Sequence, residues 1–196
     1  MKREEALTHF VENYVSKISL DKLQKLENYY ENNEDILADK FIESFRRICI
    51  KIKDLQKSGI KGKIAYINYS LLRTNIIEGT YSYLVQGLNR FSIFDRVECQ
   101  EEYDVRWAFQ FLDELEKELL EKSKLYINKV FKPDVERFIR KEFLSCNNYI
   151  VKLAEYAMPR AVELEEFREI LKEDVLKVRV GEYKGYYKDV YIYKPS

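Results

Sequence analysis

The chain has 196 residues, with 34 basic and 34 acidic side chains that cancel to a formal net charge of zero. This balance argues against a general polyanion binder, whose affinity depends on many Lys and Arg contacts to phosphate. Hydrophobic residues make up 46% and charged residues 35%, which excludes an intrinsically disordered chain and is typical of a globular protein with a sizeable core.

Amphipathic helices are expected first. Apolar residues at spacings of three and four predict one helix over residues 3–18 and a longer one over 34–57. Asp21 is placed to cap a shorter helix between them. The pair Asn32-Asn33 is the expected break before the long helix.

A hairpin is expected next, because β-branched and aromatic residues replace the helical period over residues 63–88. Glu78-Gly79 is its expected two-residue turn, a weaker signal than Asn-Gly. A third extended segment is expected over 90–97. With this turn, Leu71 should lie opposite Gln86.

The two faces of this hairpin differ in chemistry, since successive side chains of a strand point to opposite sides. An apolar and aromatic face should meet the helices, and a mixed face should lie opposite. The first face should carry Leu72, Thr74, Ile76, Tyr81, Tyr83 and Val85, and the second Tyr69, Leu71, Arg73, Asn75, Ser82, Leu84 and Gln86.

Helices are expected to return at Asp104, which is a suitable N-cap. An apolar stripe predicts one long helix over 104–130. Pro133 suits the first position of the next helix, which should end or kink at Met158-Pro159. A shorter helix is expected over 162–172.

The C-terminal residues alternate in a strand pattern on both sides of a Gly-containing turn, which predicts a hairpin of 175–181 with 186–193. Leu176, Val178 and Val180 should share one face, and Lys177 and Arg179 the other. The pattern alone leaves open whether this hairpin and the first one belong to one sheet.

The expected fold is therefore α+β, with several long amphipathic helices packed on a small antiparallel sheet made of two hairpins. We expect a single domain over 1–196. Its regions are helical over 1–58, a β-hairpin over 63–97, helical over 104–173 and a C-terminal β-hairpin over 175–193.

The mixed face of the first hairpin is the candidate ligand site. The guanidinium of Arg73 presents a rigid fork of donors that suits a carboxylate or a phosphate. Polar neighbours would orient a small anionic or polar ligand around it. The alternative is a plain solvent face on which Arg73 pairs with Glu78. The candidate ligand-binding residues are Tyr69, Arg73, Asn75, Ser82 and Gln86.

Other chemical signals are weak. The acidic stretch 95–104 has the oxygen ligands of a hard-cation site but lacks the glycine and spacing of an EF-hand, and acids before a helix also stabilise its N-terminus. His9 is the only histidine, so a His-based metal cluster is excluded. No nucleophile elbow, P-loop or dinucleotide fingerprint is present. We expect neither a metal nor a cofactor.

Cysteine usage and segment hydropathy bear on location. Cys49, Cys99 and Cys146 are far apart and form no CxxC spacing, so we expect buried free thiols rather than zinc ligands or disulfides. No secretory h-region and no apolar run of about 18 residues is present. The expected location is the cytoplasm, with no membrane contact.

Three functions stay open at this point. The favoured one is a non-enzymatic cytoplasmic binding or interaction protein that recognises a partner protein or a small polar or anionic ligand. The first alternative is an enzyme acting on a small anionic substrate anchored by Arg73. The second is a nucleic-acid-binding regulator, suggested by the mixture of Tyr and Lys in EYKGYYKDVYIYK, although the neutral total argues against it. A homodimer is expected if the apolar stripe of a long helix is wider than a single neighbouring helix can cover.

Overall fold

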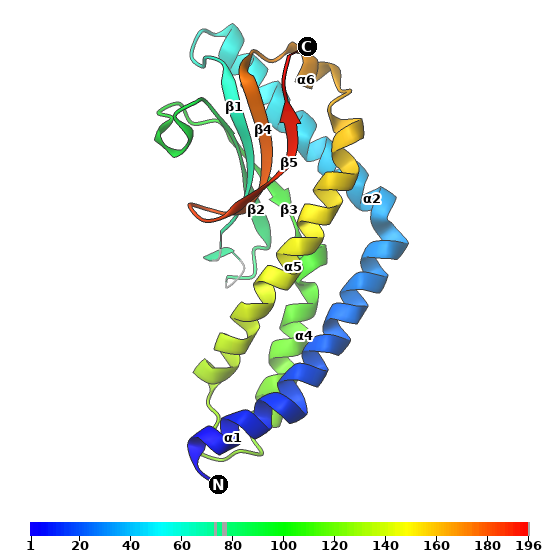
Figure 1. Ribbon diagram of the computed structural model, residues 1–196, viewed down its shortest axis with the longest axis vertical. Coiled ribbons are helices and arrows are strands. Elements are labelled where there is room, and N and C mark those ends of the chain that lie inside the picture. The colour runs from blue at the N-terminus through cyan, green and yellow to red at the C-terminus, as the bar shows by residue number, and fades with distance from the viewer. Residues whose placement is uncertain (73, 76–77, 196) are drawn as a thin grey trace. The chain divides into compact units, whose positions relative to one another are not determined.

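The computed structural model describes residues 1–72, 74–75 and 78–195, and it confirms the α+β class with helices packed on one sheet (Figure 1). The chain groups into two compact units. Unit 1 comprises Met1–Asn33 and Trp107–Tyr149, and unit 2 comprises Glu34–Arg106 and Ile150–Ser196. Two long helices continue from one unit into the other. None of the helices within the described ranges is long and apolar enough to cross a membrane.

Unit 1 is helical. Its core is built from the apolar stripes that the sequence predicts, with Phe10, Leu26 and Phe109 fully or almost fully buried. The ammonium of Lys22 is buried between the carboxylates of Glu114 (3.0 Å) and Glu118 (2.5 Å). The helices that contribute to unit 1 are α1 (Arg3–Phe10), the π-helical turn η1 (Val11–Val15), the first half of α2 (Ser16–Lys57), α4 (Arg106–Ser123) and the first half of α5 (Lys132–Ala161).

The helix ends expected between residues 18 and 34 do not occur. The predicted break at Asn32-Asn33 is wrong, because α2 runs without interruption from Ser16 to Lys57. The two amides donate to the carbonyl oxygens of Asn28 and Tyr29 one turn earlier, at 2.7 and 2.8 Å, so they satisfy their polar groups inside the helix. Asp21 is accordingly an interior residue and caps nothing.

Helix α4 ends at Ser123, seven residues before the predicted boundary near residue 130. The carboxylate of Asp104 accepts the amide of Arg106 at 2.8 Å, as its predicted capping role requires, although Asp104 itself closes a strand. At the other end of the helical region, α5 includes Pro159 in its last turn and continues to Ala161.

Unit 2 contains a five-stranded mixed sheet in the order β3-β2-β1-β4-β5. The two hairpins therefore share one sheet, and they meet where β1 and β4 pair in parallel. The other neighbouring strands are antiparallel. The strands are β1 (Ile64–Leu71), β2 (Ser82–Leu88), β3 (Gln100–Asp104), β4 (Lys172–Glu182) and β5 (Tyr187–Tyr193).

One face of this sheet packs on the second halves of α2 and α5 and on α6 (Glu165–Glu169) (Figure 1). Phe41 stacks on the ring of Tyr69, with centroids 4.7 Å apart, and Phe45 meets Phe167 at 5.3 Å. Leu176, Val178 and Val180 are buried on this face, as the alternation of β4 predicts. The sheet and these helices thus enclose the core of unit 2.

The first hairpin differs from its prediction in turn and register. Strand β1 ends at Leu71 and β2 begins at Ser82, so a ten-residue connection replaces the predicted two-residue turn. Leu71 pairs with Tyr83 rather than with Gln86, and this shift by three residues exchanges the faces of one strand relative to the other. Three of the predicted strand residues, Arg73, Ile76 and Ile77, lie outside the described residues.

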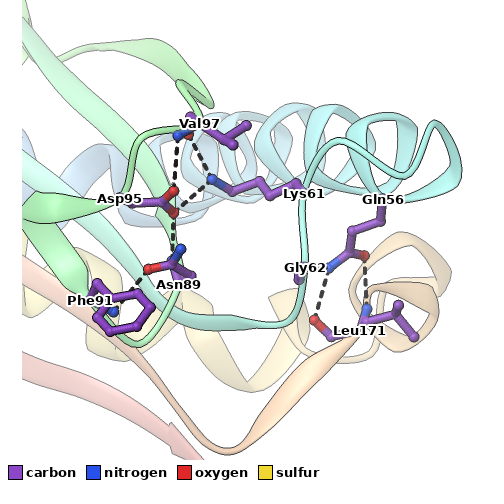
Figure 2. A network of polar contacts seen from close by, with 8 residues as sticks. All are labelled: Gln56, Lys61, Gly62, Asn89, Phe91, Asp95, Val97 and Leu171. Carbon is purple, nitrogen blue, oxygen red and sulfur yellow. Dashed lines mark hydrogen bonds and ion pairs between the residues drawn. The ribbon is translucent and has the colours of Figure 1, made fainter.

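The connection between β2 and β3 is a loop with a short 3-10 turn, η2 (Ser92–Phe94), where the sequence predicts an extended segment. A buried ion pair fixes it: Lys61 Nζ donates to Asp95 at 2.8 Å, and both side chains are 1% exposed. Asp95 also accepts the backbone amides of Asn89 (2.8 Å) and Val97 (3.0 Å) (Figure 2). The loop is therefore tied to the segment between α2 and β1.

Candidate functional site

The predicted ligand site is not assembled as a single group. Arg73, its expected anchor, lies outside the described residues. Tyr69 belongs to the helix-facing side of β1, where it is fully buried and its hydroxyl lies 2.9 Å from that of Ser44. Because of the shifted register, Tyr69 shares its face with Val85 and not with Ser82 or Gln86. It is a core residue in this fold.

The other candidates lie on the opposite face of the sheet or next to it. Asn75 lies in the connection after β1, and its amide donates to the Ser82 hydroxyl at 3.1 Å. Gln86 pairs across strands with Asn68. Within the described part of unit 2, no helix lies on this face (Figure 1). We call it the polar face, and it carries Tyr66, Asn68, Ser70, Gln86, Lys177, Arg179 and Tyr187.

Arg179 is the central cation of the polar face. It is next to Asn68 in the parallel pair of β1 and β4, and its Nε donates to Asn68 Oδ1 at 2.9 Å. Its guanidinium carbon lies 3.9 Å from the centre of the Tyr66 ring and 5.1 Å from that of Tyr187. Such stacking favours a guanidinium over an ammonium. The two rings and the amide thus fix the plane of the cation.

The surroundings of Arg179 are fixed in turn. The Tyr187 hydroxyl lies 2.7 Å from that of Ser70, which is fully buried. Tyr187 follows the tight β4–β5 turn, where a Cβ on Gly181 would come within 2.1 Å of the Tyr186 carbonyl oxygen. Glycine is needed at position 181 so that β5 can approach β4 this closely. The backbone therefore positions the ring that stacks on Arg179.

The electrostatics of Arg179 are unusual for a partly buried cation. Burial lowers the pKa of its guanidinium, while Tyr66, Tyr187 and Asp189 act in the opposite direction; an arginine stays charged at neutral pH. In the described part of the chain, no carboxylate forms an ion pair with it. Asp189 on the next strand is bonded to Lys177 at 2.6 Å instead. Nε is used, so the terminal amino groups of the fork are the donors left for a ligand.

The sequence contained part of the signal for this site. The alternation in Leu176–Val180 correctly places Lys177 and Arg179 on the face away from the core. It carries no information that β4 pairs in parallel with β1, and this pairing brings Asn68 and Tyr66 to Arg179. A long-range parallel contact has no local pattern in the sequence, so the stacked arginine was not predicted.

The other residues that the sequence singles out are the three cysteines, His9 and the acidic stretch. Cys49, Cys99 and Cys146 are buried free thiols, as predicted. His9 Nδ1 lies 2.6 Å from the Tyr126 hydroxyl. Among the described residues, no cluster of His, Cys, Asp and Glu is arranged to hold a metal ion. In the acidic stretch, Asp104 accepts the first amide of α4, whereas Glu101 and Glu102 belong to β3 and Asp95 to the buried ion pair. Helix capping therefore accounts for only part of this stretch.

No known family model, curated protein or solved structure matches this chain.

Proposed function

We propose that this protein is a non-enzymatic binding protein that recognises a small oxyanion, a carboxylate or a phosphate group, on the polar face of its sheet. The observation that carries the proposal is the guanidinium of Arg179, which is partly desolvated between Tyr66 and Tyr187 and has no ion-pair partner in the described part of the chain. A desolvated cation is costly unless an anion compensates it. An oxyanion provides that charge and matches the fork of donors.

The neighbours of Arg179 support a small polar ligand. Lys177 lies two residues away on the same face and adds a second, partly compensated cation. Asn68 holds the guanidinium at Nε, which leaves its terminal amino groups free to bind two oxygens of one anion. Gln86, next to Asn68 on β2, is a further hydrogen-bonding group. This set of side chains is suited to bind and orient an anion.

The enzymatic alternative has less support. It requires an acid of raised pKa near an anchoring arginine. Of the carboxyl groups in the described residues, Asp95 and Glu169 have resolved shifts, and hydrogen bonds to Lys61 and Lys53 help to hold the pKa of each below its ordinary value. Arg73, the anchor that this alternative invokes, lies outside the described residues. We therefore retain binding as the proposed function.

The test is an NMR titration of the protein with inorganic phosphate and, separately, with citrate. We expect saturable amide shifts in β1 and β4, centred on Asn68 and Arg179. Arg179→Gln should weaken the response about tenfold or more, because charge-assisted bonds to the guanidinium are lost. The matched control is Arg90→Gln, which removes an arginine stacked on Phe91 in a loop of the same unit and should leave the response unchanged.

Two outcomes would overturn this proposal. One is the absence of localised shifts with either anion. The other is an equal loss of response in both arginine variants, which would indicate general charge attraction. Salt-dependent retention of a single-stranded oligonucleotide, lost in Arg179→Gln while phosphate and citrate give no response, would instead favour the nucleic-acid-binding function.

A further inference from the structure

The segment that joins α4 to α5 in unit 1 combines positive charge with exposed apolar side chains. Residues 122–132 contain four lysines and no acidic residue, although the chain as a whole is neutral. Leu125, Ile127 and Phe131 are 66%, 77% and 45% exposed. Exposed apolar residues clustered within one short segment mark an interaction site more often than isolated ones do.

The backbone of this segment holds these side chains outward. Successive turns are closed by the amide of Tyr126 bonding to the carbonyl of Ser123 (2.9 Å) and that of Lys129 to Tyr126 (3.0 Å). Tyr126 and Val130 are buried, and the Tyr126 ring meets Phe10 edge-on at 5.4 Å. These two residues anchor the segment to the helices, and the residues that flank them in the chain, Leu125, Ile127 and Phe131, remain exposed. Their exposure is a property of the fold.

The acids that flank the segment are already paired. Glu121 is bonded to Lys124 at 2.6 Å, and the buried carboxylate of Asp134 is bonded to Arg3 at 3.0 Å. Arg3 also stacks on Phe131, with its guanidinium carbon 5.7 Å from the ring centre. Within the segment, Lys132 lies 3.8 Å from Glu136 and Lys129 donates to the carbonyl oxygen of Met1. The segment contains no acid of its own, so its four ammonium groups surround an apolar tip.

We propose that this basic apolar segment, residues 122–132, attaches the protein to the surface of an anionic lipid bilayer. A bilayer interface offers an apolar phase for Leu125 and Ile127 and anionic headgroups for the lysines at the same depth. Lysine stems can cover apolar surface while their ammonium groups remain among the headgroups. Phosphate groups of a nucleic acid would neutralise the lysines but would leave the aliphatic side chains without a partner. The attachment is peripheral and needs no membrane-spanning helix. It therefore departs from the expectation of no membrane contact, which rests on the absence of a secretory or spanning segment. It is independent of the anion site on the sheet.

The experiment is flotation of the full chain with vesicles of phosphatidylcholine, with and without about one third phosphatidylserine. We expect binding to the anionic vesicles only, weakened by salt because the electrostatic contribution is screened. Ile127→Asp should reduce the partition coefficient about tenfold or more, since it places a charge in the apolar phase. The matched control, Phe94→Asp, changes an equally exposed (79%) apolar residue of the β2–β3 loop and should bind as the unmodified protein does.

A spectroscopic readout separates insertion from adhesion. Ile127→Trp should show a blue shift of its fluorescence with anionic vesicles, and Phe94→Trp should show none. The proposal is overturned if the unmodified protein does not float with anionic vesicles at low salt, or if Ile127→Asp and Phe94→Asp lose binding equally. It is also overturned if polyglutamate binds with the same dependence on Ile127, because the partner would then be an acidic polypeptide.

Discussion

Lys61 and Asp95 show how a single buried pair fixes a loop. The carboxylate accepts from Lys61 and from the amides of Asn89 and Val97, and the ammonium also donates to the Val97 carbonyl at 2.8 Å. Each charge is therefore surrounded by hydrogen-bonding partners, which is the condition under which a buried ion pair is tolerated. Removing one member leaves the other charged and unpaired in a site that water does not reach.

Asp95→Asn should lower the free energy of unfolding by about 3–5 kcal/mol, the usual cost of breaking a buried pair from one side. Denaturation in urea, read as the change in midpoint at constant slope, measures this. Glu169→Gln is the matched control, because it breaks an ion pair with Lys53 in which the carboxylate is 42% and the lysine 24% exposed. That variant should leave the midpoint nearly unchanged. Equal shifts in both variants would contradict the assigned role of Asp95.

The same pair has a consequence for pH dependence. Burial raises the pKa of Asp95, but the hydrogen bonds from Lys61 and from the backbone outweigh it, so the pKa lies below its ordinary value of 3.8. The stability contributed by the pair is therefore fully present above 3.8 and is lost as the pH falls through the lower, folded-state value. The difference in stability between the native protein and Asp95→Asn should shrink in this acid range.

The elements of this chain differ in how far the sequence predicts them. Apolar stripes reveal the helices, because a core of side chains such as Phe41 and Leu112 imposes the helical period on the sequence. The ends are less predictable. Asn32 and Asn33 are typical helix breakers, yet bonds to carbonyls one turn earlier keep them in α2. Ile127 fits the stripe of α4 but follows its end, and this difference exposes it.

The sheet is harder to predict from the sequence than the helices are. Alternation gives the two faces of β4 correctly, but the register of β1 with β2 depends on a ten-residue connection whose length no local pattern specifies. Tyr69 was assigned to the wrong face of the sheet. A register shift by an odd number of residues exchanges the faces of one strand relative to its neighbour. Arg179 is defined by a parallel pairing between strands about 110 residues apart in the chain, as its bond to Asn68 shows.

A substitution at Gly181 tests whether the close approach of β4 and β5 is needed to position Tyr187. A methyl group at this position would lie 2.1 Å from the Tyr186 carbonyl oxygen and 2.7 Å from Tyr187 Cα, both backbone atoms that cannot move independently. Gly181→Ala should therefore lower the free energy of unfolding by about 1–3 kcal/mol and weaken the anion response at Arg179, because Tyr187 is displaced. Thermal melting and the phosphate titration measure the two effects.

Gly62→Ala is the matched control for this substitution. Nothing lies within 4 Å of a Cβ at position 62, and its backbone is not in the left-handed region. We expect a change of less than about 0.5 kcal/mol, in either direction. If Gly181→Ala behaved like Gly62→Ala, the close approach of the two strands would not be what positions Tyr187.

At the scale of the whole molecule, two compact units are linked by helices that do not stop at their boundary. Helix α2 runs from Ser16 to Lys57 and α5 from Lys132 to Ala161, and each contributes to both units. A helix is cooperative along its length, because each residue added extends an existing ladder of bonds. We therefore predict that the units unfold together, in keeping with the single domain that the sequence predicts.

The reactivity of the three buried thiols measures whether the two units unfold together. Cys146 belongs to unit 1, and Cys49 and Cys99 belong to unit 2. Pulsed alkylation along a urea gradient, followed by mass spectrometry, should show all three becoming reactive at one urea concentration. Cys146 reacting at a distinctly lower or higher concentration than Cys49 would show two separate folding units.

Burial raises the pKa of Cys146 to about 12 and also raises those of Cys49 and Cys99. Unfolding releases these protons more readily, so stability should fall as the pH rises above the ordinary thiol value of 9.0.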